Sequence, residues 1–347
     1  MEMNINIFGS TGIIGCKSLD IIKKNYPNIK VNLLCANKND KLLLKQIKEF
    51  KPNFVYIHNQ QKHKNLKSKL DKSVKILDFN DLSNYLLNSK SQFSILAISG
   101  YKSLNFLEQI IHNTNNLGLV SKEAIVSAGH LFNKKKFFQK TKIFPIDSEH
   151  YSLFDYFNNY NLNEQTKKII LTASGGPFYN KNFNTLKNIT FNQAIKHPKW
   201  KMGYKNSIDS ATLVNKCLEV IEAHYLFNIP YEMIDILIHP EAIVHSIVER
   251  KNYLTNMNLF KNDMSIPIFN FLNQSNKKYK NYNNKLYLKS FSNLTFNEVK
   301  NDIFPIYQFF KDLDKSNPSN LIKFNIGNEF AVNLFKNKII KYTDITK

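Results

Sequence analysis

The sequence predicts an α/β protein that begins with a parallel β-sheet and ends with a helical region. Strand-like and helix-like segments alternate over residues 1–146, which is typical of a parallel sheet with helices on both faces. A mixed pattern follows over 147–274, then a polar linker over 275–298 and a helical pattern over 299–347. The length of 347 residues is consistent with two or three domains.

Short apolar runs locate the individual elements. In the N-terminal region they predict strands at 6–8, 31–35, 54–57, 94–98, 117–120 and 143–145. Helices are predicted between these strands, for example at 16–25 and 42–50, whereas the lysine-rich segment 62–75 is predicted to be a solvated surface. The later regions are predicted to hold strands at 169–171 and 243–249 and helices at 209–227, 304–310 and 325–334.

The composition restricts the class of protein and its surroundings. A formal net charge of +21 suggests a nucleic-acid partner, but Arg250 is the only arginine, and arginine is the residue that reads phosphates and guanines with paired hydrogen bonds. Compositional drift explains the lysines better, so no nucleic-acid partner is expected. Three separated cysteines indicate no disulfide framework. Because the chain has no bilayer-length apolar run and no room for a signal peptide before its first strand, we expect a cytoplasmic protein without a membrane partner.

A glycine-rich loop directly follows the first predicted strand. It reads Gly9-Ser10-Thr11-Gly12-Ile13-Ile14-Gly15 and opens the first predicted helix. Glycines at this spacing let the backbone approach a pyrophosphate, which the positive end of the helix then stabilises. The loop therefore predicts a Rossmann-like dinucleotide-binding domain, and the alternative is a glycine-rich turn that binds no ligand.

The end of the second strand bears on the choice of cofactor. An acidic residue there would bind the ribose hydroxyls of NAD, whereas Asn37, Lys38 and Asn39 offer amides and a cation. A cation suits the additional 2′-phosphate of NADP. The alternative is that Lys38 is one more surface lysine of a lysine-rich chain.

Three acidic residues suggest a metal site in the central region. Asp147 and Glu149 are two residues apart, which places both carboxylates on one side of a strand end or extended loop. Glu219 lies one helical turn from Asn215 on the predicted helix. Such oxygen ligands select magnesium or manganese over zinc. Taken singly, each acid could instead be a solvated charge or a helix cap.

Hydroxyl, amide and ammonium groups near these acids suggest a phosphate site. Ser174 precedes two glycines whose amides could bind an anion, and Ser210 is predicted to cap the helix that follows it. Asn215 and Lys216 add an amide and a positive charge. The alternative for Ser210 is a capping role alone.

The segment 197–203 has the composition of a flap that closes over substrate. It combines a proline, a terminal glycine and the only tryptophan of the chain, Trp200. Lysines on both sides of Trp200 argue against full burial of the segment. A mobile cover of this kind would exclude water from a reaction site.

Together, these motifs resemble the 1-deoxy-D-xylulose-5-phosphate reductoisomerase family, and the resemblance runs from Gly9 to about Thr346. Its most specific elements are the glycine loop, Asp147-Ser148-Glu149-His150, Ser174-Gly175-Gly176-Pro177-Phe178, His197-Pro198-Lys199-Trp200-Lys201-Met202-Gly203 and the series Asp209-Ser210 through Asn215-Lys216 to Glu219.

The resemblance implies a role for each matched residue. The metal ligands would be Asp147, Glu149 and Glu219, holding magnesium, manganese or cobalt. Substrate would be bound by Ser148, Glu149, Ser174, His197, Trp200, Ser210, Asn215, Lys216 and Glu219, with Met202 also in the flap. The catalytic residues would be Lys122, Glu149 and His197. NADPH would be bound by Ser10, Thr11, Gly12, Ile13, Ile14, Asn37, Lys38, Asn39, Ser121, Lys122, Glu123, Gly203 and Met264.

The function implied is the conversion of 1-deoxy-D-xylulose 5-phosphate to 2-C-methyl-D-erythritol 4-phosphate in non-mevalonate isoprenoid biosynthesis. The family's reaction combines a retro-aldol and aldol rearrangement with reduction by NADPH, assisted by one divalent cation, in a homodimer. In this reading, 1–146 is the NADPH-binding domain and 147–274 is the catalytic, metal- and substrate-binding domain, with the flap at 197–203. The region 299–347 is a shortened helical domain. The sequence departs from the family at Ser121, where asparagine is usual, and at Ile13, where a small polar residue is common.

Two other functions remain open on the sequence alone. One is an NADP-dependent oxidoreductase without the isomerase step, which would give a reduced but unrearranged sugar phosphate. The other is a nucleic-acid-binding protein, which would bind DNA or RNA in a salt-sensitive way without NADPH turnover.

The cofactor prediction can be tested at Lys38. Replacing its cation by an anion in Lys38→Glu should weaken NADPH relative to NADH by about tenfold, the equivalent of about 1.4 kcal/mol. Dissociation constants for both cofactors would be measured by fluorescence, with Lys64→Glu in the lysine-rich segment as the control for charge alone. An unchanged NADPH-to-NADH ratio in Lys38→Glu would refute the assignment.

Overall fold

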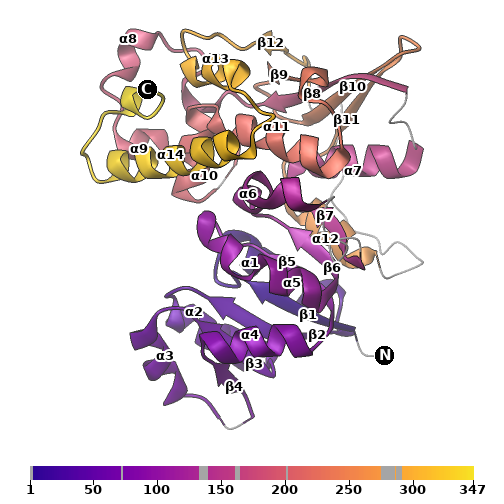
Figure 1. Cartoon of the computed structure of the whole chain (residues 1–347), viewed down its shortest axis with the longest axis vertical. Helices are drawn as coiled ribbons and strands as arrows, with labels where there is room; N and C mark the ends of the chain where they lie inside the picture. Colours follow the sequence, from indigo (N-terminus) through magenta and orange to yellow (C-terminus); the bar gives the residue numbers. More distant parts are fainter. Residues whose placement is uncertain are drawn as a thin grey trace. The chain divides into compact units, whose positions relative to one another are not determined.

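A computed structural model describes residues 3–71, 73–132, 140–160, 165–200, 202–274, 286 and 291–347 (Figure 1). The chain forms two compact units. The first comprises Met1–Ala124, Leu131–Asp147 and Met264–Tyr282. The second comprises Ile125–His130, Ser148–Asp263 and Asn283–Lys347.

The first unit is built on a seven-stranded sheet in the order β4-β3-β2-β1-β5-β6-β7, and every neighbouring pair is parallel. The strands are β1 (Met3–Phe8), β2 (Ile29–Ala36), β3 (Phe54–Ile57), β4 (Lys75–Leu77), β5 (Ser91–Leu96), β6 (Thr114–Leu119) and β7 (Lys142–Pro145). The strand order reverses between β1 and β5, and such a reversal is where α/β sheets bind ligands. The predicted parallel sheet and its six predicted strands are confirmed.

Helices join these strands, as a parallel sheet requires. They are α1 (Ile13–Asn25), α2 (Asp40–Phe50), α3 (Gln60–Lys67), α4 (Phe79–Asn88), the 3₁₀ helix η1 (Tyr101–Phe106) and α5 (Leu107–Asn113). The helix α6 (Lys122–Phe132) joins β6 to β7, and its residues Ile125–His130 belong to the second unit. A later helix, α12 (Ser265–Asn273), also belongs to this unit. The Tyr26 hydroxyl of the C-cap of α1 donates to the Phe269 carbonyl at 3.1 Å, and Phe271 packs on Phe93 of β5.

The second unit contains a mixed five-stranded sheet in the order β11-β10-β8-β9-β12. Its strands are β8 (Thr166–Ala173), β9 (Ile234–Ile238), β10 (Val244–Arg250), β11 (Thr255–Leu259) and β12 (Asn297–Glu298). Only β8 and β9 are parallel among the pairs of this described sheet. Its helices are α7 (Ser148–Tyr160), η4 (Gly176–Phe178), α8 (Phe183–Leu186), α9 (Phe191–Ala194), α10 (Tyr204–Ala211), α11 (Val214–Phe227), η5 (Tyr231–Met233), α13 (Pro305–Asp312), α14 (Pro318–Lys336) and η7 (Tyr342–Asp344).

The core of the second unit surrounds α11. Buried residues of this helix, such as Cys217 and Ile221, share one apolar cluster with Leu171 of β8, Phe310 of α13 and Leu321 of α14. The C-terminal helices thereby help to cover the helix that also carries Glu219. The predicted helices at 304–310 and 325–334 correspond to α13 and α14 and are confirmed.

The single helix predicted at 209–227 is wrong. The chain forms two helices there, because Leu213 adopts a left-handed conformation with φ of 70° and ends the continuity between α10 and α11. Ser210 lies inside α10 near its C-terminal end, so the predicted N-cap role is also wrong. Nothing in the local sequence indicated that a leucine would take a backbone conformation that favours glycine.

Other differences concern short elements and boundaries. The segment 62–75 is largely exposed as predicted, but it also contains most of α3 and the first residue of β4. The strands β9, β11 and β12 were not predicted. The compact units place α12 with the first unit and α13 and α14 with the second, which differs from the predicted three-part division. Most of the predicted linker at 275–298 lies outside the described residues.

Among the described residues, no helix combines the length and the apolar character that a membrane crossing requires.

The packing of Gly15 yields a test of the first unit. A Cβ atom there would lie 2.3 Å from the Gly9 carbonyl oxygen and 2.6 Å from the Ser10 Cα, both backbone atoms that cannot rotate away. Gly15→Ala should therefore lower stability by on the order of 1–3 kcal/mol and lower the affinity for NADPH. Thermal unfolding and NADPH fluorescence would measure both. Gly327→Ala is the matched control, since a Cβ there meets nothing within 4 Å; the same loss in both variants would contradict the packing argument.

Candidate active site

The glycine loop joins the end of β1 to the start of α1 in the first unit. Gly9 has φ of +92°, and a Cβ there would lie 2.4 Å from the Ala97 carbonyl oxygen, so only glycine fits. The Gln46 side-chain amide stabilises the loop by donating to the Ser10 carbonyl oxygen at 2.8 Å. Gly12 is the N-cap of α1 and provides no side chain to satisfy the first helical amides. The start of α1 thus has amides without a side-chain cap, which supports the predicted binding of an anion there.

The residues predicted to select the cofactor follow β2, the strand next to β1. Asn37, Lys38 and Asn39 are all exposed. The Asn39 side chain accepts from the Leu42 amide at 3.1 Å and caps α2. Since β1 and β2 are parallel, their carboxyl ends bring Lys38 and the glycine loop to the same edge of the sheet. Asn39 therefore has a structural task, while Lys38 is available to a ligand phosphate.

A second group of predicted residues follows β6 in the same unit. The Ser121 hydroxyl donates to the Glu123 carboxylate at 3.2 Å, and both side chains are buried. Lys122 begins α6, and its ammonium contacts the Asp147 carboxylate at 2.6 Å. The predicted catalytic lysine is thus paired with a predicted metal ligand.

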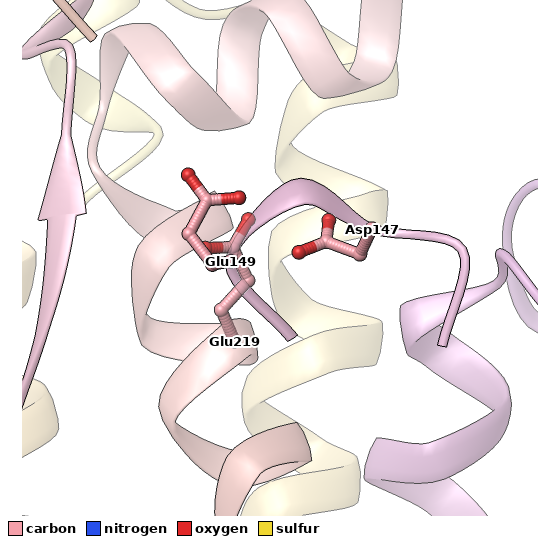
Figure 2. A group of neighbouring side chains, drawn as sticks. All are labelled: Asp147, Glu149 and Glu219. Carbon is pink, nitrogen blue, oxygen red and sulfur yellow. The ribbon is translucent and has the colours of Figure 1, made fainter. Parts of the chain in front are cut away.

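The three predicted metal ligands lie together. Asp147, Glu149 and Glu219 each offer a carboxylate oxygen, and these atoms lie within 4.8 Å of one another (Figure 2). Asp147 is in the loop after β7, Glu149 in the first turn of α7, and Glu219 in α11. The predicted proximity of the acids is confirmed, although Glu149 is helical and the strand-like spacing argument was wrong for it.

Two ammonium groups, that of buried Lys216 and that of partly buried Lys122, offset the charge of these acids. Lys216 contacts Glu149 at 2.8 Å and Glu219 at 2.5 Å, and Lys122 contacts Asp147. Burial alone would lower the pKa of Lys216, but the Glu149 and Glu219 carboxylates together raise it above its ordinary value. Three carboxylates and two ammonium groups leave one formal negative charge, so the donor set is suited to a divalent cation with oxygen ligands.

The hydroxyl groups predicted to bind phosphate form a separate cluster in the second unit. The His197 Nε2 lies 3.0 Å from the Ser174 hydroxyl and 3.1 Å from the Ser210 hydroxyl. Ser174 follows β8, and Ser210 lies in the last turn of α10. Asn215 and Lys216 were also predicted to bind the phosphate. In the structure the Asn215 amide donates to Glu219, and the Lys216 ammonium contacts Glu149 and Glu219.

Two glycines shape the loop beside these hydroxyls. Gly175 and Gly176 have φ of +78° and +65°, a region that other residues rarely adopt. A Cβ at Gly176 would lie 2.9 Å from the Ala211 Cα and from the Ser210 carbonyl oxygen. The amide of Gly176 donates to the Ser174 hydroxyl at 3.2 Å. The loop therefore packs directly on the end of α10 and sets the distance between the two serines.

Hydrogen bonds determine the tautomer of His197. Its Nδ1 accepts the backbone N–H groups of Lys199 at 3.2 Å and Trp200 at 2.8 Å, which leaves the proton on Nε2. Burial is the main cause that lowers the pKa of His197 to about 4, with a contribution from Lys216 and an opposing one from Glu149. The neutral ring thus presents an N–H donor to the two serines or to an anion between them.

The predicted flap begins at His197. Trp200 is half-buried, and its ring lies 6.4 Å from that of His245, which stacks on Phe260 at 4.0 Å. Lys201 lies outside the described residues. Gly203, at the N-cap of α10, and Met264, at the N-cap of α12, were both predicted to contact the cofactor, and those roles stay predictions.

Sequence reasoning missed the residues behind the acids and the flap. His150 is fully buried; its Nε2 lies 2.9 Å from the Glu219 carbonyl oxygen and its Nδ1 3.4 Å from the Glu222 carboxylate. Available signals were the position of His150 directly after Glu149 and that of Glu222 one turn after Glu219. His245, which contacts the flap, is distant in sequence and gave no such signal.

Comparison with known proteins decides the family. Residues 5–129 match the family model of 1-deoxy-D-xylulose 5-phosphate reductoisomerase, and residues 143–227 and 259–347 match models of its C-terminal domains. The reductoisomerase of Sulfurihydrogenibium sp. (strain YO3AOP1) is 40% identical over 345 residues, which cover 99% of this chain and 89% of the relative. The chain belongs to the 1-deoxy-D-xylulose 5-phosphate reductoisomerase family. A second reductoisomerase, from Pelagibacter ubique (strain HTCC1062), is 38% identical and is covered to 88%.

Solved reductoisomerase structures share the fold. One, in complex with NADPH, fosmidomycin and magnesium, has a TM-score of 0.90 at 30% identity and covers 99% of this chain and 87% of its own. The enzyme from Zymomonas mobilis in complex with NADPH has a TM-score of 0.89 at 31% identity, with coverage of 100% and 90%. The predicted family, the α/β fold class and the enzyme class are therefore confirmed, while the roles of individual residues stay predictions.

The lowered pKa of His197 predicts a loss of stability in acid. The unfolded chain takes up this proton near pH 6.5 and the folded chain only near pH 4, so stability falls as the pH falls through this window. One such site contributes at most about 1.4 kcal/mol per pH unit. Denaturant unfolding of His197→Gln should lose less stability than the wild type between pH 6.5 and 4. The exposed His112→Gln serves as control, and identical pH slopes for His197→Gln and the wild type would refute the prediction.

Proposed function

We propose that this chain rearranges and reduces 1-deoxy-D-xylulose 5-phosphate to 2-C-methyl-D-erythritol 4-phosphate, with NADPH and one divalent cation, in isoprenoid biosynthesis. The observation that carries the proposal is the group of three carboxylates within 4.8 Å, on a chain that also has a dinucleotide loop and a serine-histidine cluster. Family membership supports the reaction, and the geometry supports the assignment of residues to each part of it.

Asp147, Glu149 and Glu219 would hold the divalent cation. When bound, that cation supplies a Lewis acid for the substrate oxygens, and NADPH supplies the hydride. The Ser148 hydroxyl, which donates to Glu149 at 2.6 Å, lies beside this site and would bind a substrate hydroxyl. Lys122 would keep Asp147 oriented and present an ammonium to the substrate oxygens.

The phosphate of the substrate would lie at the serine-histidine cluster. Ser174 and Ser210 would donate hydroxyl hydrogen bonds, and His197 would donate from Nε2 without taking up a proton. Asn215 and Lys216 now neutralise and orient the acids. With a divalent cation there, the Lys216 ammonium would face a like charge, and a phosphate would become its best partner.

The flap would close the site against water. His197 links the start of the flap to both serines, so binding of the phosphate would draw this segment toward the reaction site. Trp200 and Met202 would then cover the substrate with apolar surface and protect the reactive intermediate from solvent.

NADPH would be bound by the first unit. The amides at the start of α1 would bind the pyrophosphate, with Ser10, Thr11, Gly12, Ile13 and Ile14 forming the loop. Lys38 would bind the 2′-phosphate, and Asn37 and Asn39 would flank it. Ser121, Lys122 and Glu123 after β6, together with Gly203 and Met264, would contact the nicotinamide end.

We further propose a cytoplasmic homodimer that binds a small sugar phosphate and neither nucleic acid nor membrane. The support for the dimer is β11, which lies at the edge of its sheet. Tyr253, Leu254 and Met257 expose 92%, 57% and 44% of their surfaces at or next to this strand. An exposed apolar edge strand is a site where a second chain can pair.

An assay of NADPH oxidation with 1-deoxy-D-xylulose 5-phosphate, with and without Mn²⁺, tests the function. Identification of the product is essential. A reduced but unrearranged sugar phosphate would indicate an oxidoreductase without the isomerase step. Salt-sensitive retention of RNA or DNA without turnover would instead favour the nucleic-acid alternative.

Glu219→Gln tests the metal site. Loss of one charged ligand should lower kcat/KM by more than about 100-fold, because even partners outside the ligand shell are typically worth 10–100-fold. Mn²⁺ affinity, followed by electron paramagnetic resonance, should fall in parallel, while NADPH affinity stays at the wild-type value. The exposed Glu232→Gln controls for charge removal. Wild-type Mn²⁺ affinity in Glu219→Gln would remove this residue from the metal site.

A further inference from the structure

Ser210 is held by buried contacts on both sides of it. It lies in the last turn of α10 and is partly exposed, whereas Asp209 before it and Ala211 after it are each 1% exposed. The Ser210 hydroxyl therefore belongs to the serine-histidine cluster, while the residues on both sides of Ser210 are held by other contacts. The contacts made by Asp209 and Ala211 therefore determine the position of the Ser210 hydroxyl.

Both oxygens of the Asp209 carboxylate have a partner. The Lys205 ammonium, one turn earlier in α10, contacts Oδ2 at 2.6 Å, and the Asn328 side-chain amide of α14 donates to Oδ1 at 2.9 Å. All three residues are buried, and hydrogen bonds to a buried charged group are worth more than neutral ones. Asn328 thus ties α14 to the residue next to Ser210.

The other neighbour of Ser210 is tied to η7. The Tyr342 hydroxyl donates to the Ala211 carbonyl at 2.7 Å. The last carbonyls of a helix have no partner within the helix, so this bond satisfies a group at the C-terminal end of α10. Burial raises the pKa of the Tyr342 hydroxyl far above its ordinary value, so it remains a donor. Its ring packs on Phe178 and Phe335.

The same turn of α10 also packs on the glycine loop at Gly176. Gly176 leaves no room for a Cβ against the Ser210 carbonyl oxygen or the Ala211 Cα. One apolar cluster includes Phe178 of η4, Ala211 of α10 and Tyr342 of η7. A displacement of α14 or η7 would therefore move Ser210 relative to Ser174 and His197.

We propose that Asn328 and Tyr342 are positioning residues for the phosphate of the substrate, acting through Asp209 and Ala211 on the Ser210 hydroxyl. This inference rests on the proposed function, in which Ser210 binds that phosphate. It adds two residues that would act through Asp209 and Ala211 without binding the substrate themselves, and it assigns to the C-terminal helices a part in substrate affinity as well as in stability.

Asn328→Ala and Tyr342→Phe test the proposal. Each should raise KM for 1-deoxy-D-xylulose 5-phosphate by about tenfold, while kcat, KM for NADPH and the Mn²⁺ dependence stay within about twofold of the wild type. The affinity for inorganic phosphate, measured by competition with the substrate, should fall by the same factor as KM rises. A purely structural role would not separate the phosphate from the cofactor and the cation in this way.

Tyr307→Phe is the matched control. The Tyr307 hydroxyl on α13 donates to Asp235 at 2.8 Å, so this variant also loses one hydrogen bond of a largely buried tyrosine in the same unit. It should lower Tm like Tyr342→Phe and leave KM for the substrate unchanged. If Tyr342→Phe lowers Tm but leaves KM unchanged, or if it weakens NADPH, Mn²⁺ and substrate alike, the proposal is overturned.

Ser210→Ala separates this inference from the function on which it rests. If Ser210→Ala raises KM but Asn328→Ala and Tyr342→Phe do not, the positioning role fails and the proposed function stands. If Ser210→Ala leaves KM unchanged, the phosphate assignment itself fails. Tyr342→Phe keeps the ring and its aromatic contacts, so it decides the question even if Asn328→Ala does not fold.

Discussion

The Asp147, Glu149 and Glu219 carboxylates repel one another, and the arrangement of the site depends on how this repulsion is offset. Carboxylates this close, two of them buried, are stable only when cations neutralise them. Lys122 and Lys216 supply two positive charges, and the remaining negative charge together with the oxygen donor set favours a divalent cation. Both lysines are therefore as much a part of the site as the acids, and removing either would leave an uncompensated charge.

The break at Leu213 separates the two clusters of side chains in the site. It ends α10 just after Ser210 and begins α11 just before Asn215 and Lys216, so neighbouring residues in sequence belong to different helices. Ser210 thereby joins Ser174 and His197, while Glu219 and Lys216 join Glu149. In a continuous helix the Ser210 and Glu219 side chains would project about 180° apart, because nine residues make two and a half turns.

How much could be predicted from the sequence follows from how local each signal is. The glycine loop and the spacing of Asn215 and Glu219 depend on neighbouring residues, and both were predicted correctly. The stacking of His245 on Phe260 depends on the pairing of β10 with β11, a strand that was not predicted. The contact of Trp200 with His245 joins segments 45 residues apart, for which a single sequence holds no periodic signal. The left-handed Leu213 was missed because packing of the two helices overrides the backbone preference of leucine there. The family motifs identified Asp147 and Glu149, although the local geometry assumed for Glu149 was wrong.

In the proposed function, Lys216 links the metal site to the phosphate site. Its ammonium lies between the Glu149 and Glu219 carboxylates, and its positive charge contributes to lowering the pKa of His197. A cation among the acids would repel this ammonium toward the serines, where it would strengthen the binding of a phosphate dianion. A phosphate already bound there would in turn remove the competitor for the acids. Cation and phosphate should therefore bind with positive coupling that is reciprocal by thermodynamic necessity, and one buried lysine is sufficient to produce it.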